Sequence, residues 1–341
     1  MRAVSVYQAE GMVLCHDVTE IIPGKRKGRA FNKGHVIQKE DINKLLMIGK
    51  ENIYVWEVNE KLLHENDAAR RFARAAAGEG LRLAEAAEGK VELKAAVTGL
   101  LKINVEALER INDIDQLAAA TLHSNQIVQA GTKIAGCKII PLVIETEKIR
   151  QLEEICAQHY PLMEVKKLQA FKIGVVTTGS EIYHGRIEDA FGPVLEKKFQ
   201  QWGSSILKQI FVPDDAERIA EAIQHLLALG ADMIVTTGGM SVDPDDVTPA
   251  GIRAAGGKII SYGAPTLPGA MFMLAYFGSI PVLGLPGCVM YHKSTIFDLV
   301  APRILAGEEL TRRDITKLGH GGLCLVCDEC RYPECGFGKG G

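Results

Sequence analysis

The stretch from Asp232 to Pro249, DMIVTTGGMSVDPDDVTP, constrains the fold and chemistry of this chain more than any other. It begins with the apolar run Met233 to Val235, which is typical of a strand buried on both faces of a parallel sheet. Gly238 and Gly239 then allow a sharp turn and let backbone N–H groups approach a bound oxyanion, which residues with side chains would prevent. The sequence therefore predicts a phosphate-binding turn at the end of a buried strand.

Acidic residues follow this turn, since Asp243, Asp245 and Asp246 stand within four positions. Thr248 and Pro249 then supply an N-cap and a first-turn proline for a helix. Carboxylates beside a phosphate would repel it, so their presence favours a divalent cation between them. The alternative is an ordinary strand-to-helix turn with solvated acidic residues.

Two further turns of this kind occur between residues 171 and 305. The run FKIGVVTTGSEI ends a buried strand in Thr177-Thr178-Gly179-Ser180, and the apolar run Ile280 to Leu283 leads into Leu285-Pro286-Gly287. Strands alternate with helices throughout this region, which predicts a doubly wound, mainly parallel α/β sheet. Because ligands bind at the carboxyl ends of the strands in such sheets, we expect the three turns to line one site.

Local signals predict the remaining elements. In the α/β region we expect helices at 194–202, 218–229, 249–255 and 290–305, strands at 206–212 and 258–261, and a glycine- and proline-rich loop before residue 280. The preceding half is expected to be mixed α+β, with helices at 40–49, 62–77 and 105–111, a short helical piece at 117–122 and a small β element at 125–145. We therefore divide the chain into an N-terminal region (1–165), an α/β domain (166–306) and a C-terminal tail (307–341).

Composition indicates a globular protein, because hydrophobic residues make up 47% and charged residues 24% of the 341 residues. A formal net charge of -3 gives no reason to expect nucleic acid as a partner. The N-terminus lacks the apolar core of a signal peptide, and glycines and a proline interrupt the most apolar stretch. We therefore expect a cytoplasmic protein with no membrane partner.

Five ordered motifs resemble a known family. TTGSEI, VPDDAERI, the stretch from Asp232 to Pro249, Pro268-Gly269 and Leu285-Pro286-Gly287 are similar to the molybdopterin-binding domain shared by the MoeA and gephyrin molybdotransferases and the MogA type of adenylyltransferase. The resemblance covers about residues 170 to 305. It implies a site for molybdopterin or its adenylylated form, bound by Thr177, Thr178, Gly179, Ser180, Thr237, Gly238, Gly239, Ser241, Pro268, Gly269, Pro286 and Gly287.

The resemblance also implies roles for four acidic residues. Asp214 and Asp246 match functional aspartates of the adenylyltransferase branch, and Glu181 and Asp189 match acidic positions of the molybdotransferase branch. Capping of the helices that follow Asp189 and Asp214 is the alternative for those two residues. Ser180 stands where molybdotransferases often have aspartate, and Cys288-Val289 replaces an Asn-Pro pair.

The expected function is that of a molybdotransferase-like enzyme, which inserts molybdate into adenylylated molybdopterin with Mg²⁺. The alternatives are a molybdopterin adenylyltransferase that uses ATP, and a noncatalytic cofactor carrier or sensor. The resemblance further implies a homo-oligomer and a molybdoenzyme or cofactor-pathway protein as partner. The acidic segment that molybdotransferases carry near their N-terminus is absent from this sequence.

The C-terminal tail concentrates half of the cysteines of the chain. Cys324, Cys327, Cys330 and Cys335 follow the spacing C-x2-C-x2-C-x4-C within a segment of low hydrophobic content. Such a segment would need a metal to order it, and four thiolates suit either zinc or an iron–sulfur cluster. Free thiols are the alternative.

Overall fold

The computed structural model describes residues 2–22, 26–55, 61–241, 243 and 246–340. The chain forms two compact units. The first consists of Met1–Ala96, Ile103–Leu122 and Gly131–Glu164, and the second consists of Val97–Lys102, His123–Ala130 and Val165–Gly341. Every residue that we predict to bind ligand or metal lies in the second unit.

The first unit opens with two small antiparallel pairs and a short helix. Strand β1 (Arg2–Ser5) pairs with β4 (Asn52–Val55), and β2 (Val18–Ile22) pairs with β3 (Arg26–Phe31). Helix α1 (Asp41–Met47) ends just before Gly49, whose φ of 78° is the left-handed conformation that favours glycine. The helix predicted at 40–49 is confirmed.

The rest of the first unit is built on an antiparallel sheet in the order β6-β7-β11-β9 (Leu81–Leu83, Lys90–Ala95, Lys133–Ile139, Leu117–Thr121). Strands β5 (Leu62–His64) and β12 (Val143–Glu145) form a separate pair. Helix α2 (Glu65–Ala76) packs on β7 and β11, and α3 (Val105–Asn112) and α4 (Thr146–Gln158) complete the unit. The helical piece predicted at 117–122 is wrong. The helix propensity of its alanines is overridden by pairing with β11, and Leu117 and Ala119 alternate inward as in a strand.

The second unit contains the predicted α/β sheet, in the order β15-β14-β16-β19-β18-β17. Its strands are β14 (Lys172–Thr178), β15 (Ser205–Val212), β16 (Met233–Thr237), β17 (Lys258–Tyr262), β18 (Met273–Phe277) and β19 (Ile280–Leu285). The first four in sheet order are mutually parallel, whereas β18 runs antiparallel to both β19 and β17. The doubly wound, mainly parallel architecture is therefore confirmed, but β18 falls in a segment predicted as loop.

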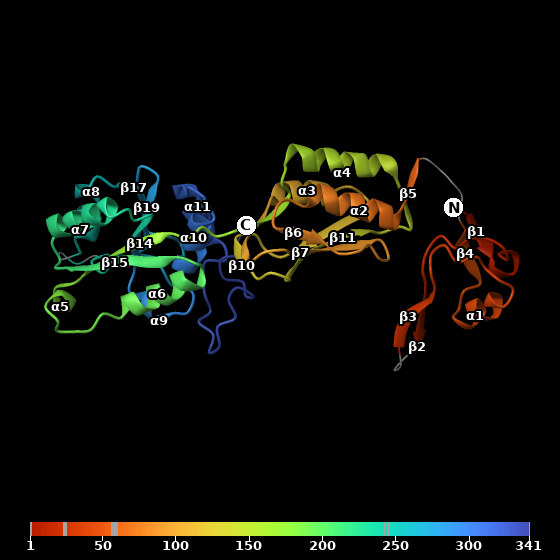
Figure 1. The fold of residues 1–341 in the computed structure, drawn as a ribbon, viewed down its shortest axis with the longest axis horizontal. Helices are drawn as coiled ribbons and strands as arrows, with labels where there is room; N and C mark the ends of the chain where they lie inside the picture. Colours follow the sequence, from red (N-terminus) through yellow and green to blue (C-terminus); the bar gives the residue numbers. More distant parts are fainter. Residues whose placement is uncertain (1, 23–25, 56–60, 242, 244–245, 341) are drawn as a thin grey trace. The chain divides into compact units, whose positions relative to one another are not determined.

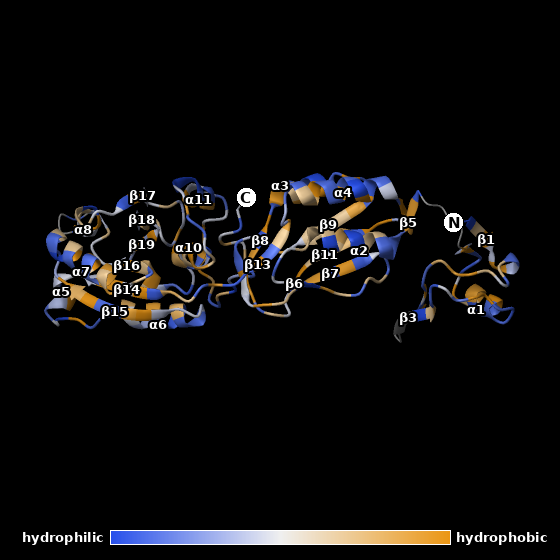
Figure 2. Cartoon of the chain, turned by 45° about the horizontal axis from the view of Figure 1, so that its top comes forward, coloured by the Kyte–Doolittle hydropathy of each residue, from blue (hydrophilic) through white to orange (hydrophobic). Residues whose placement is uncertain are grey.

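Helices cover both faces of this sheet, which explains why its central strands are continuous apolar runs. Helices α6 (Phe191–Gln201), α9 (Cys288–Tyr291) and α10 (Ile296–Leu305) contribute to one hydrophobic core, and α7 (Ala216–Ala228) and α8 (Thr248–Ala254) contribute to the other. In Figure 1, α6 and α9 lie on one side of the strands and α7 and α8 on the other. Figure 2 shows hydrophobic colour along β14 and β16 and hydrophilic stretches on α6 and α7.

The long helix predicted at 290–305 is divided in the structure, so that prediction is wrong in its first half. Helix α9 ends at Tyr291, and α10 begins only after Thr295. Thr295 caps α10 reciprocally with Asp298: Thr295 accepts from the Phe297 N–H at 3.2 Å, and its own N–H donates to Asp298 at 2.8 Å. This capping box fixes the start of α10 and breaks the apolar run.

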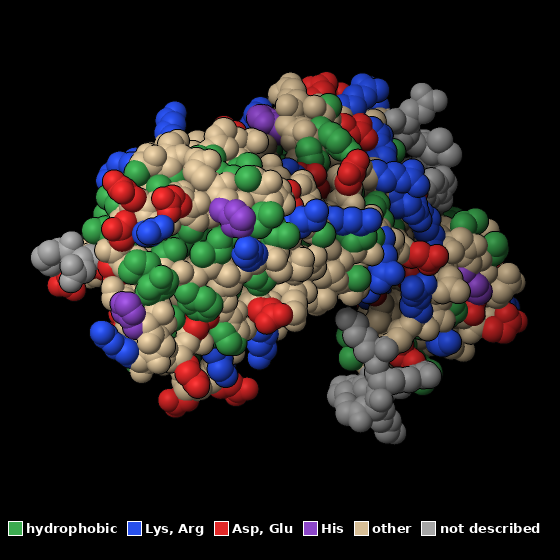
Figure 3. Space-filling model, turned by 60° about the vertical axis from the view of Figure 1, so that its left-hand side comes forward, with side chains coloured by type: hydrophobic (Ala, Val, Ile, Leu, Met, Phe, Trp, Pro, Cys, Tyr) green, Lys and Arg blue, Asp and Glu red, His purple; other side chains and the backbone are tan. Residues whose placement is uncertain are grey.

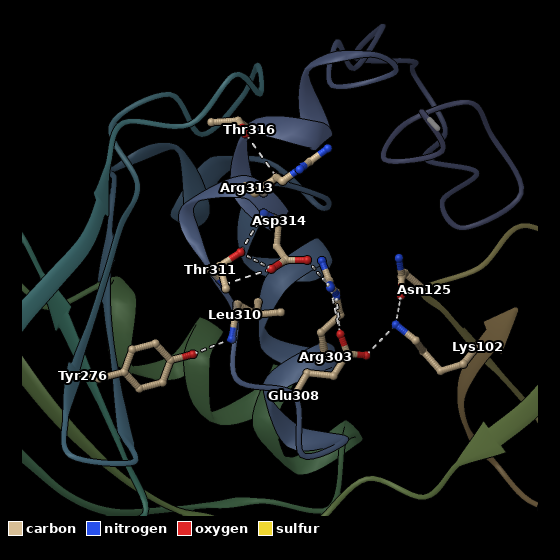
Figure 4. Close-up of polar contacts among 10 residues, drawn as sticks. All are labelled: Lys102, Asn125, Tyr276, Arg303, Glu308, Leu310, Thr311, Arg313, Asp314 and Thr316. Atoms are coloured by element: carbon tan, nitrogen blue, oxygen red, sulfur yellow. Dashed lines mark hydrogen bonds and ion pairs between the residues drawn. The ribbon is translucent and has the colours of Figure 1, made fainter. Parts of the chain in front are cut away.

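An ionic network closes the carboxyl end of α10 (Figure 4). Arg303 donates to Glu308 at 2.8 Å and to Asp314 at 3.1 Å, and Lys102 lies 2.7 Å from Glu308. Asp314 also forms a capping box with Thr311 at the start of α11 (Arg312–Thr316). The network therefore joins α10 and α11 to β8 (Gly99–Ile103), which forms a small sheet with β10 (Gln126–Val128) and β13 (Met163–Lys166).

The surface seen in Figure 3 mixes both signs of charge with hydrophobic side chains. This agrees with the small formal net charge of -3. Within the described ranges, every helix is too short or too polar to span a bilayer.

Candidate functional site

Three turns meet at one edge of the sheet of the second unit. Strands β14, β16 and β19 are neighbours and parallel, so their carboxyl ends lie side by side. Thr237, the last residue of β16, is in register with Thr177 on one side and with Leu285 on the other. The structure thus brings together the turns that the sequence predicts to line one site.

The turn after β16 requires glycine at both positions. Gly238 has a φ of 83° and Gly239 a φ of 55°, and both values disfavour residues with a side chain. A β-carbon on Gly238 would stand 2.3 Å from the carbonyl oxygen of Thr178, and one on Gly239 would stand 2.5 Å from Thr248 Oγ1. The backbone here is therefore packed closely against the neighbouring turn and the start of α8.

Hydroxyl groups hold the carbonyl oxygens of this turn. Thr178 Oγ1 donates to the carbonyl oxygen of Thr237 at 3.1 Å, and Thr248 Oγ1 donates to that of Gly238 at 2.9 Å. The Thr248 N–H donates to the carbonyl oxygen of Gly239 at 3.2 Å. Backbone oxygens would repel an anion, and in this turn each of the three is engaged within the protein. The arrangement favours an oxyanion at the turn.

A small acidic turn follows the glycines. The Asp243 N–H donates to Asp246 Oδ2 at 2.8 Å, and the Asp246 N–H donates to the carbonyl oxygen of Asp243 at 3.0 Å. Asp243 is exposed and Asp246 half-buried, whereas Asp245 lies outside the described residues. Tyr262 donates to the carbonyl oxygens of Met240 and Ser241, at 3.0 and 3.3 Å; burial raises the pKa of Tyr262, and the Asp246 carboxylate raises it further.

The chemistry of this turn fits Mg²⁺. Carboxylate oxygens are the hard ligands that Mg²⁺ prefers, and Mg²⁺ is commonly held by one or two carboxylates together with a substrate phosphate. Asp243 and Asp246 supply two such groups next to the turn that we predict to bind phosphate. No cluster of three or more His, Cys, Asp or Glu side chains suited to a metal occurs among the described residues.

Asp214 holds the first turn in place. Its Oδ2 accepts a hydrogen bond from the Ser180 N–H at 2.8 Å. The alternative in which Asp214 caps the next helix is wrong, because Asp215 is the N-cap of α7 and accepts from the Arg218 N–H at 3.0 Å. The Asp214 side chain therefore does not cap α7 but contacts the turn that carries Thr178 and Gly179.

Asp189 lies one residue before Ala190, the N-cap of α6, and its side chain still holds the first turn of that helix. Its two oxygens accept from the N–H groups of Phe191 at 2.9 Å and Gly192 at 3.0 Å. Gln209, which the sequence reasoning missed, donates to Asp189 at 2.7 Å and to Thr177 Oγ1 at 2.9 Å. Gln209 is on β15, next to Lys208, so its polarity alone does not single it out in the sequence.

Glu181 lies in the short helix α5 (Ser180–Tyr183), directly after the first turn, and is exposed. Its carboxylate folds back over Gly179, since a β-carbon there would stand 3.4 Å from each carboxylate oxygen. Gly179 has a φ of 139°, which favours glycine. Glu181 therefore stands at the rim of the edge formed by the three turns.

The remaining predicted residues lie on two other loops of the second unit. Gly287, after β19, has open space where a β-carbon would stand, and it follows Pro286 at the third turn. Gly269 has a φ of 126° and packs so closely on α10 that a β-carbon would come within 2.5 Å of Ile296. The contacts described for the loop of Pro268 and Gly269 are with α10 and the C-terminal tail, through Ile296 and Leu323.

The four tail cysteines carry free thiols: Cys324 and Cys335 are partly buried, and Cys327 and Cys330 are exposed. They are not already gathered around a metal position in the described part of the chain. Cys330 Sγ lies 3.4 Å from Ser294 Oγ.

Comparison with known families agrees with this geometry. Residues 174–306 match the family described as "Probable molybdopterin binding domain", and residues 3–57 match a family described as a domain of unknown function.

Curated relatives carry several different names. The chain is 33% identical over 95 residues to the molybdopterin adenylyltransferase of Pyrococcus furiosus, covering 28% of this chain and 56% of that protein. It is 25% identical over 176 residues to the molybdopterin molybdenumtransferase of Synechococcus elongatus, covering 49% of this chain and 44% of that protein. A CinA-like protein of Syntrophus aciditrophicus is 38% identical over 88 residues, covering 25% of this chain and 20% of that protein. The chain therefore spans about half or less of the relatives it matches.

Among solved structures, the molybdopterin biosynthesis enzyme MoaB of Thermus thermophilus aligns at 18% identity with a TM-score of 0.34, over 40% of this chain and 98% of that one. The match to the probable molybdopterin-binding domain family lies in the α/β part of the chain, residues 174–306.

Proposed function

We propose that the edge formed by the three turns binds the terminal phosphate of molybdopterin or adenylylated molybdopterin, and that the chain acts in molybdenum cofactor assembly as a molybdotransferase-like enzyme. The observation that carries this proposal is the turn Thr237-Gly238-Gly239. It combines close backbone packing, engaged carbonyl oxygens and two adjacent carboxylates, inside the domain that matches the family.

The residues at the edge formed by the three turns would have different roles, which follow from the chemistry of their groups. Backbone N–H groups of the glycine turns take the phosphate oxygens, because no side chain stands in the way. Asp246, with Asp243, would hold Mg²⁺ beside the phosphate; when bound, the metal neutralises negative charge and polarises a phosphoryl or molybdate oxygen. Asp214 would fix the first turn through Ser180, and Glu181 at the rim would accept a proton.

A second candidate function is adenylylation of molybdopterin with ATP. It is favoured by the match of 33% identity to an adenylyltransferase and by Thr248 of the DVTP motif, whose hydroxyl holds the carbonyl oxygen of Gly238. A noncatalytic carrier would use the same edge for binding alone.

Reaction products distinguish these candidates. The full chain is incubated with Mg²⁺ and either adenylylated molybdopterin plus molybdate, or molybdopterin plus ATP. Release of AMP that depends on molybdate supports the molybdotransferase, and release of pyrophosphate from ATP identifies the adenylyltransferase instead. Tight binding of the ligand without release of AMP or pyrophosphate would support the noncatalytic carrier.

A further inference from the structure

The four tail cysteines lie on a loop whose two ends are joined. At its base the Gly338 N–H donates to the carbonyl oxygen of Gly321 at 2.9 Å. A β-carbon on Gly340 would overlap the carbonyl oxygen of His320, so the returning chain is seated directly on the departing one. Phe337 is buried, with 3% of its surface exposed. Residues 322–337, here called the cysteine loop, thus leave and rejoin the domain at one place.

Further contacts fix the base of the cysteine loop to the second unit. Leu267 exchanges two hydrogen bonds with it, since its N–H donates to the carbonyl oxygen of Gly322 and its carbonyl oxygen accepts from the Cys324 N–H, both at 2.8 Å. Tyr332 donates to the carbonyl oxygen of Asp298 on α10 at 3.3 Å. Because the ends of the loop are already joined in the folded protein, a ligand that binds to the loop does not have to supply the entropy cost of closing it.

Local hydrogen bonds shape the backbone around three of the four cysteines. The Val326 N–H donates to Cys324 Sγ at 3.5 Å, and Val326 has a φ of 50°, which β-branched residues rarely adopt. Cys330 and Cys335 directly flank the turn that Glu334 closes by donating to the carbonyl oxygen of Arg331 at 2.6 Å, so their backbones return side by side.

Hydrophobic burial does not account for the tip of the cysteine loop. Residues 324–340 contain no helix or strand, and Leu325 and Val326 are 81% and 60% exposed. We propose that the cysteine loop is a four-thiolate site for a transition metal, formed by Cys324, Cys327, Cys330 and Cys335 when the tip closes over a fixed base. The shared chemistry is thiolate ligation of zinc or of an iron–sulfur cluster. Each thiol releases its proton on coordination, so binding tightens as the pH rises.

Metal content of the full chain tests this proposal. The protein is purified under reducing, anaerobic conditions, its metal is measured by elemental analysis and its visible spectrum is recorded. The metal-free protein is then titrated with Zn²⁺ and, separately, with Co²⁺, whose spectrum reports tetrahedral thiolate ligation. The variants are Cys327→Ser and Cys330→Ser, with Glu329→Gln as the matched control, because Glu329 is an exposed carboxylate between these two cysteines.

We expect about one zinc ion or one cluster per chain, near-complete loss in either cysteine variant and no change in the control. Visible charge-transfer bands in the purified protein would identify the cluster, and their absence together with bound zinc would identify zinc. The proposal would be overturned if all four thiols still react with a thiol reagent after the Zn²⁺ titration and no zinc or iron is bound. It would also be overturned if Cys330 and Cys335 form a disulfide in protein purified under reducing conditions. Thermal unfolding of the metal-free variants, compared with the metal-free parent, shows whether the rest of the domain remains folded.

Discussion

The Ser180 N–H donates to the carboxylate of Asp214 at 2.8 Å, and this bond joins the turn after β14 to the loop after β15. The two loops, which precede helices α5 and α7, are thereby joined to each other. Because Thr178 in the same turn donates to the carbonyl oxygen of Thr237, the hydrogen bonds continue to the glycine turn after β16. Asp214 is therefore connected to the candidate site through the backbone.

Asp214→Asn and Asp214→Ala should behave differently. The asparagine variant retains an oxygen that can accept from Ser180, so we expect the first turn and ligand binding to persist while Mg²⁺-dependent turnover falls. The alanine variant leaves the Ser180 N–H without its partner, at a cost of roughly 1–3 kcal/mol, and should lose both. Calorimetric binding and product formation check this, and equal ligand affinities for the two variants would contradict the positioning role.

Gly238→Ala should abolish ligand binding and destabilise the domain. The left-handed backbone alone costs about 1–2 kcal/mol, and contact with the Thr178 carbonyl oxygen at 2.3 Å adds to it. Gly203→Ala is the matched control, because Gly203 has a similar φ of 79° but open space where the β-carbon would stand. Urea unfolding of the two variants should show the larger loss at Gly238. A loss no greater than at Gly203 would mean that the close packing is unimportant.

Asp246→Asn should reduce Mg²⁺-dependent product formation by roughly 100-fold or more, because it removes a charge that would hold the metal. Asparagine can still accept from the Asp243 N–H, so we expect the acidic turn to keep its shape. Asp232→Asn is the control, since Asp232 accepts from the Lys172 N–H at the opposite end of the same sheet. Full activity of Asp246→Asn would remove this residue from the site.

Acid should weaken the second unit through Asp314. Burial raises the pKa of Asp314, but the Thr311 hydrogen bonds and Arg303 outweigh it and lower the pKa from 3.8 to about 2. A lowered carboxylate pKa stabilises the folded state above pH 3.8, and this stability, up to roughly 2 kcal/mol, is lost as the pH falls toward 2. Asp314→Asn should flatten this part of the stability profile. Glu309→Gln, at an exposed neighbour, should not, and a profile unchanged in Asp314→Asn would refute the assignment.

The sequence was sufficient to predict the strands and turns that build the site. Strands β14 and β16 are continuous apolar runs, and glycines with positive φ mark the turns that follow them, so local signals alone suffice. The start of α10 was missed although Thr295 and Asp298 have capping-box spacing. There the apolar run outweighed the capping signal.

Contacts between distant segments could not be predicted from local patterns. Gln209 contacts Asp189 and Thr177, which are far from it in sequence, and only the sheet order brings them together. The exchange of hydrogen bonds between Leu267 and the cysteine loop is of the same kind. The alanines of β9 favour a helix locally, but pairing with β11 makes this segment a strand.

The most direct test of the central claim is a calorimetric titration of the full chain with molybdopterin and with adenylylated molybdopterin, each with and without Mg²⁺. We expect submicromolar binding that prefers the adenylylated form, is strengthened by Mg²⁺ and is lost in Gly238→Ala. Absence of binding to either form would refute the proposed function, and it would mean that the three turns bind some other phosphate-bearing ligand.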